Sequence, residues 1–272
     1  SASNVLFPSR RIGAYVNTSP APSKSDLFKY TLRQADNSMV LCQRLCQWAA
    51  RGPDLEEDIS LTNIGLDLIG QARSLYQYSA SLCDQQVNED DLAFMRDSHE
   101  WSNLLLVEQP NGDFADTIAR QYLYDAWHLL FLEQLTESND TTLAAIAAKS
   151  IKEVKYHNRH SSMWIKRLGD GTEVSHQRMQ DAIAAVWPFT AEMFIPDELD
   201  QRMLEFGTGV DLKALKHTWD SQVSSLLVDA TLSKPVAGEA IVGGRQGQHA
   251  EYLGDLLEEM QSLPRSMPNH QW

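Results

Sequence analysis

The chain has 272 residues, 43% of them hydrophobic, and carries 37 acidic against 23 basic side chains, for a net charge of −14. A surface this negative repels phosphate backbones, which excludes nucleic acid as an expected partner. Three cysteines are too few for a disulfide framework, and no run of about 18 apolar residues is present to span a bilayer. The sequence therefore predicts a soluble, cytoplasmic globular protein.

The N-terminal stretch 1–24 contains three prolines and several serines, and it lacks the apolar core of a signal peptide. It is predicted to form an extended arm. Beyond it, apolar residues recur at three- and four-residue spacing, and the alternation typical of strands is almost absent. Residues 25–272 are therefore predicted to form a single all-α domain.

Capping and helix-breaking residues set the expected ends of the helices. Ser25 or Asp26 suits the N-terminus of the first long helix, and Asp113 with Asp116 resembles the start of a later one. Trp187, which precedes a proline, marks a break. The predicted helices span residues 26–51, 55–83, 90–98, 114–136, 141–168, 175–194, 211–232 and 248–263.

Two of these helices carry a carboxylate where a di-iron bundle protein would place metal ligands. Such a site uses a carboxylate and a His three residues later on each of two helices. Here the third residue after Asp67 is Gly70, and the third after Glu153 is Tyr156. Both pairs are incomplete, and we interpret them as degenerate di-iron positions.

Further polar residues lie on apolar helix faces nearby. Asp125 and His128 share the apolar stripe of helix 114–136, and Glu153 and His157 share a face of helix 141–168. Buried polar groups need partners, so these are either metal ligands or members of hydrogen-bonded pairs. With Asp67, they supply three carboxylates, fewer than the roughly four that accompany two His in a di-iron centre.

Four cations lie near Glu153 and His157 on the predicted helix 141–168, namely Lys149, Lys152, Lys155 and Arg159. They are expected to neutralise the interior carboxylates by ion pairing, because an unpaired buried carboxylate is costly. The sequence therefore predicts no metal, no cofactor and no catalytic residue on this chain.

A glycine-rich loop at 238–247 precedes the last helix and contains Gly243, Gly244, Arg245 and Gly247. A basic loop that opens a helix can cradle a phosphate. The loop is not a P-loop and no strand precedes it, so the alternative interpretation is a surface turn.

Several stretches carry a resemblance to a known family. The run Asn103–Gln121 (NLLLVEQPNGDFADTIARQ) is very specific, and the similarity extends over roughly residues 27–272. The other matching stretches are 32–37, 63–73, 125–128, 151–153, 156–157, 167–169, 253–254 and 259–261. The sequence resembles the structural subunits of the bacterial multicomponent phenylacetyl-CoA monooxygenases, which are ring 1,2-epoxidases.

The resemblance implies a ferritin-like four-helix bundle with additional C-terminal helices. It also implies a non-catalytic chain that scaffolds a catalytic oxygenase subunit, and that subunit holds the di-iron centre and the acyl-CoA. Candidate anchors for this interface are Trp101, Leu104, Phe114 and Tyr122. Whether the isolated chain forms a homodimer stays open.

Two other functions stay open as well. The chain could be a catalytic di-metal oxygenase with unusual ligands, drawn from Asp67, Asp125, His128, Glu153 and His157. It could instead be a helical protein that binds an acyl-CoA or a similar anion through Arg245 and the adjacent glycines.

Overall fold

A computed structural model of the chain describes residues 21–236 and 238–267. Within these ranges the protein is all-helical and contains no strand, as predicted. Most of the expected arm at 1–24 lies outside the described residues. The helices are α1 (Lys24–Cys46), α2 (Leu55–Leu82), α3 (Glu89–Phe94), η1 (Ser98–Glu100), α4 (Leu105–Glu108), α5 (Phe114–Leu135), α6 (Thr141–Gly169), α7 (Glu173–Val186), η2 (Trp187–Phe194), α8 (Glu198–Glu205), α9 (Leu212–Asp229), η3 (Gly244–Gln246) and α10 (Glu251–Ser266).

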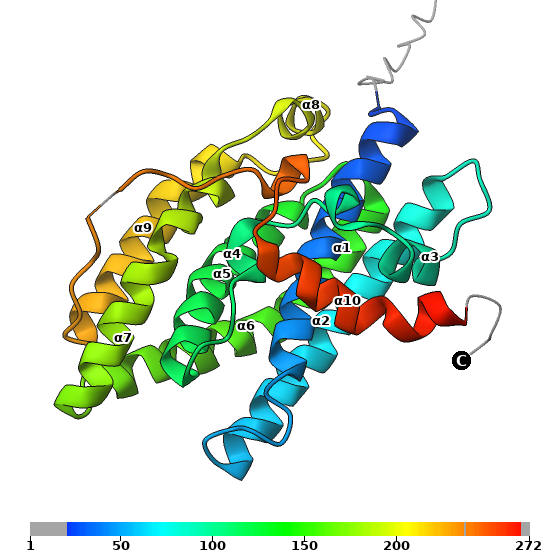
Figure 1. Ribbon diagram of the computed structural model, residues 1–272. Coiled ribbons are helices and arrows are strands. Elements are labelled where there is room, and N and C mark those ends of the chain that lie inside the picture. The colour runs from blue at the N-terminus through cyan, green and yellow to red at the C-terminus, as the bar shows by residue number, and fades with distance from the viewer. Residues whose placement is uncertain (1–20, 237, 268–272) are drawn as a thin grey trace, which may run out of the picture.

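Two long helical hairpins form the centre of the fold. Helix α1 packs along α2, α5 packs along α6, and α2 contacts α6, so that the four make a bundle (Figure 1). Their inner faces supply a continuous apolar core that includes Leu41, Leu68, Trp127 and Val154. Burial of these stripes gives the bundle most of its stability, because isolated helices are marginal in water. The arrangement is the expected ferritin-like bundle.

The starts of the long helices follow the local chemistry of the chain. Asp54 accepts the N–H of Glu57 at the beginning of α2. Asp113 and Asp116 form a reciprocal capping box at the beginning of α5, as predicted. The first helix differs from the prediction, because Ser23 rather than Ser25 or Asp26 is its cap.

The first helix also ends at Cys46, earlier than the predicted end at residue 51. Residues 47–52 form turns, in which Ala50 has a positive φ of 62°. A left-handed residue of this kind cannot continue a right-handed helix, so the chain turns before it reaches Gly52.

The C-terminal elements cover the bundle from outside. Helices α7 and α9 pack against α5, and the expected break near Trp187 is the switch from α7 to η2. Helix α8 was not predicted from the sequence. The last helix, α10, lies across α1 and contacts α3 (Figure 1). No helix in the described part of the chain is long and apolar enough to cross a membrane.

Candidate functional site

Two of the predicted degenerate positions, Asp67 and Glu153, lie where α2 and α6 meet inside the bundle, and both are half-buried. Asp67 accepts a hydrogen bond from the His157 imidazole, with 3.0 Å between Oδ2 and Nε2. Glu153 accepts one from the side-chain amide of Gln71, with 2.9 Å between Oε2 and Nε2. Each carboxylate on one helix is therefore engaged by a donor on the other, which fixes the register of α2 against α6.

Asp125 occupies the same interior from α5 and is almost fully buried. Its Oδ1 accepts from the Gln121 amide at 2.7 Å, and its Oδ2 accepts from the Ser161 hydroxyl at 2.8 Å. Burial raises the pKa of Asp125 to about 6, although the nearby His157 and these hydrogen bonds act in the opposite direction. We call Asp67, Gln71, Asp125, Glu153 and His157 the interior seam.

His128 lies next to the interior seam but does not bond to Asp125, in contrast to one of the predicted interpretations. Its ring packs against Tyr124, with 5.0 Å between the ring centroids. Burial, together with the nearby His157, lowers the pKa of His128 to about 3. The imidazole is therefore neutral at physiological pH and packs mainly as an aromatic ring.

A further buried carboxylate was missed by the sequence argument. Glu57 accepts from the His160 imidazole at 2.7 Å and from the Trp164 indole N–H at 2.8 Å. The sequence did contain an indication that Glu57 is buried. Glu57 precedes Leu61 and Ile64 by four and seven residues, which places it on the apolar face of α2. A Glu on such a face requires buried donors.

The predicted neutralisation of these acids by Lys149, Lys152, Lys155 and Arg159 is wrong. Among the residues that the structure describes, none of these cations makes an ion pair. They lie on the exposed side of α6, whereas His157 and Ser161 face inward. Tyr156 is also exposed and lies under the Arg159 guanidinium, outside the interior seam.

The donor set does not fit a di-iron centre. Gly70 offers no ligand, Tyr156 points away from the interior, and the carboxylate that α1 supplies, Asp36, is bound by Arg96 and Tyr76. Within 21–236 and 238–267, no three His, Cys, Asp or Glu side chains converge where they could hold a metal ion. The acids of the interior seam accept from amide, hydroxyl and imidazole donors instead.

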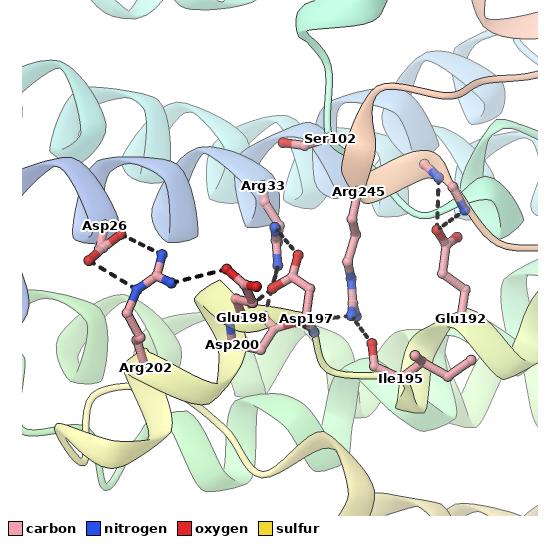
Figure 2. Close-up of polar contacts among 12 residues, drawn as sticks. Asp26, Arg33, Ser102, Glu192, Ile195, Asp197, Glu198, Asp200, Arg202 and Arg245 are labelled. Carbon is pink, nitrogen blue, oxygen red and sulfur yellow. Dashed lines mark hydrogen bonds and ion pairs between the residues drawn. The ribbon is translucent and has the colours of Figure 1, made fainter.

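The glycine-rich loop binds an anion, but the anion belongs to the protein itself. The buried carboxylate of Glu192 accepts the N–H groups of Gly243 and Gly244 at 3.0 and 2.8 Å through Oε1 (Figure 2). Its Oε2 accepts the N–H of Leu105 at 2.8 Å. Gly244 is required, because an added Cβ would collide with the carbonyl oxygen of Asn103. The loop is thus neither a free phosphate cradle nor a surface turn.

Arg245 is likewise engaged within the chain. Its guanidinium donates to Asp200 at 3.1 Å and to the carbonyl of Ile195 at 2.8 Å (Figure 2). Asp200 also pairs with Arg33 at 2.9 Å, and Arg33 pairs with Asp197 at 2.8 Å. We call Arg33, Asp197, Asp200 and Arg245 the clasp, because it joins α1, α8 and η3. The predicted use of Arg245 for an external anion is not supported.

The candidate interface anchors are mostly internal. Trp101, Leu104 and Tyr122 are buried in the core of this chain. Phe114 is half-buried and packs edge-on against Trp164, with 5.0 Å between the ring centroids. The sequence could not separate core from interface here, because both use the same apolar residue types.

The fold and the site define an all-helical, ferritin-like bundle whose inward-facing acids accept hydrogen bonds from protein donors. The chain belongs to the phenylacetic acid catabolic protein family, whose model matches residues 15–272. It is similar to a subunit of the 1,2-phenylacetyl-CoA epoxidase of Escherichia coli (strain K12). The two are 52% identical over 248 residues, which cover 91% of this chain and 100% of that relative.

Proposed function

We propose that this chain is a non-catalytic structural subunit of a phenylacetyl-CoA epoxidase, and that it scaffolds the catalytic subunit, which holds the di-iron centre. The similarity to an epoxidase subunit supports the enzyme class. Three free cysteines, Cys42, Cys46 and Cys83, suit the reducing cytoplasm, where we place the protein.

The single observation that carries the non-catalytic role is the bonding of the interior acids. Asp67, Asp125 and Glu153 each accept hydrogen bonds from protein donors on a neighbouring helix or turn. A metal centre would have to replace these bonds and would find too few ligands within reach. These bonds support our proposal that the chain works without a metal of its own.

A bundle of this kind supports a partner by binding its folded form. A subunit that binds only the folded state of the catalytic chain stabilises it by mass action, and the effect grows with subunit concentration. The interior then needs to keep only its shape, which hydrogen-bonded side chains can do without reactive chemistry.

The test is co-expression of this chain with the catalytic subunit of the same organism, followed by metal analysis and kinetics. We expect iron to accompany the catalytic subunit and to be well below one atom per chain in the isolated protein. The double variant Asp67→Asn with Glu153→Gln keeps side-chain size, and the reconstituted complex should retain kcat within about twofold.

A matched control replaces the exposed acids Asp220 and Asp229, again with amides. Loss of epoxidation in the seam variant, with the complex intact and the control active, would assign a catalytic role to this chain. Stoichiometric iron in the isolated protein would do the same, and absence of any complex would remove the scaffolding role.

A further inference from the structure

Helix α2 is apolar on two opposite sides. Its inner side packs against α1 through residues such as Leu61, Ile64 and Leu68. Its outer side exposes four large aliphatic side chains, whose exposed fractions are 71% for Leu55, 52% for Ile59, 62% for Leu66 and 39% for Ile69. A surface helix normally has one apolar side, which faces the core, and a contiguous second apolar side that stays exposed is typical of a contact surface.

The exposed surface continues from α2 onto α6. Leu66 and Gly70 line a pocket of about 80 Å³ together with Ile146 and Lys149 of α6. Asp67, Gln71 and Glu153 of the interior seam line the same pocket, so the seam reaches the surface here. A Cβ added at Gly70 would meet nothing within 4 Å, so packing inside the chain does not explain a glycine in the middle of this helix. Glycine lowers helix stability but lets another backbone approach closely.

A row of cations borders this surface. Lys149, Lys152, Tyr156 and Arg159 follow one another at three- and four-residue spacing, so they share one side of α6. None of the three cations has an ion-pair partner within the described part of the chain, although the protein as a whole carries a net charge of −14. These exposed cations are therefore available to pair with carboxylates of another molecule.

We propose that this surface docks the catalytic subunit, which would present an apolar helix face with carboxylates along one edge. We name it the α2–α6 face and define it by Leu55, Ile59, Leu66, Ile69 and Tyr156, with Lys149, Lys152 and Arg159 as its rim. The inference rests on the proposed function. A second copy of this chain is the poorer occupant, because two chains of net charge −14 repel each other.

The first test measures binding of the purified catalytic subunit by calorimetry, with Leu66→Asp and, separately, Ile59→Asp in this chain. Each should raise Kd at least about tenfold, because a charge would be buried at the centre of the contact. The control is Val228→Asp on α9, where the side chain is 75% exposed, and it should change Kd less than about twofold. Thermal unfolding of each variant alone should match the wild type, since all three positions are exposed.

The second test reverses the rim charges. The double variant Lys149→Glu with Lys152→Glu should weaken binding about tenfold and make it less sensitive to salt. Lys213→Glu with Lys216→Glu, two exposed lysines of α9, is the matched control and should leave both quantities unchanged.

The outcomes separate this inference from the proposed function. If the wild type binds the catalytic subunit and the Leu66→Asp and Ile59→Asp variants bind it equally well, the α2–α6 face is overturned and the scaffold role stands. If the wild type does not bind the catalytic subunit, both the α2–α6 face and the scaffold role are overturned. Light scattering of this chain alone gives the third outcome. A homodimer that Leu66→Asp dissociates, with binding of the catalytic subunit unaffected, would assign the face to a second copy and overturn the proposal.

Discussion

The interior seam and the clasp engage their acids with different partners. In the clasp, carboxylates face guanidinium groups, and although burial alone would raise the pKa of Asp197, the bonds and charge of Arg33 lower it to about 2. Asp200 is buried more deeply, and burial raises its pKa although Arg245 and Arg33 act in the opposite direction. In the interior seam, Asp125 faces neutral donors, and burial raises its pKa to about 6. The acids of the interior seam are thus held by hydrogen bonds from amide, hydroxyl and imidazole groups, whereas pairing with guanidinium groups is found at the junction of α1, α8 and η3.

Breaking the clasp should have the largest effect. Asp200→Ala would leave Arg245 without a carboxylate and Arg33 with only Asp197, so both guanidinium groups would lose buried partners. We expect the free energy of unfolding to fall by about 3–5 kcal/mol in urea titrations. The control Asp220→Ala breaks an exposed pair with Lys234 and should cost less than about 1 kcal/mol. Equal losses in the two variants would remove the distinction between buried and exposed pairs.

The contact between Glu192 and the glycine-rich loop should come next. Glu192→Ala leaves the amides of Leu105, Gly243 and Gly244 buried without an acceptor, with an expected loss of about 3 kcal/mol. Hydrogen exchange should accelerate at these three amides before it does so in α5. Glu192→Gln keeps one acceptor oxygen and should lose less, so an identical loss would show that side-chain volume matters more than the hydrogen bonds.

The interior seam should make the free energy of unfolding depend on pH. Burial raises the folded-state pKa of Asp125 from 3.8 to about 6, so between those values the folded protein holds a proton that the unfolded chain has released. The free energy of unfolding therefore falls as pH rises through this window. Relative to Asp125→Asn, which does not titrate, the wild type should lose about 2–3 kcal/mol between roughly pH 4 and pH 7. Parallel stability curves for the two proteins would contradict the raised pKa.

The smallest effect on stability is expected for the lysines of α6 that the sequence argument paired with the interior acids. Lys149→Ala and Lys152→Ala should each change the free energy of unfolding by no more than about 0.5 kcal/mol, because neither side chain pairs with an acid of the interior seam. Urea titration of the isolated chain checks this. A loss as large as that of a buried pair would restore the ion-pairing prediction.

Local signals located the long helices well. Helix α2 was predicted to within one residue, because its apolar stripe is regular. Helix α5 was predicted equally well from Asp113 and Asp116. The end of α1 was predicted too late, because the turn there depends on Ala50 in the left-handed conformation. Such a residue is usually glycine, and an alanine gives no sequence indication of the turn.

The partners of the interior acids could not be predicted in the same way. Lys152 and His157 are both close to Glu153 along α6, and only the rotation of that helix against α2 decides which of them faces inward. Gln71 and Ser161 are neutral donors that no sequence pattern singles out. The link from Glu192 to Gly243 joins segments 51 residues apart, beyond any local rule.

The three amides that donate to Glu192 lie far apart in the sequence, so these hydrogen bonds form at different times during synthesis. Leu105 and Glu192 can meet once η2 has followed the bundle out of the ribosome, but Gly243 and Gly244 emerge about fifty residues later. Until then the Glu192 carboxylate accepts a hydrogen bond from only one of its three amide donors, the N–H of Leu105. The loop leads directly into α10, which packs against α1 and α3, so the last helix is also the last element that the growing chain can add to the fold.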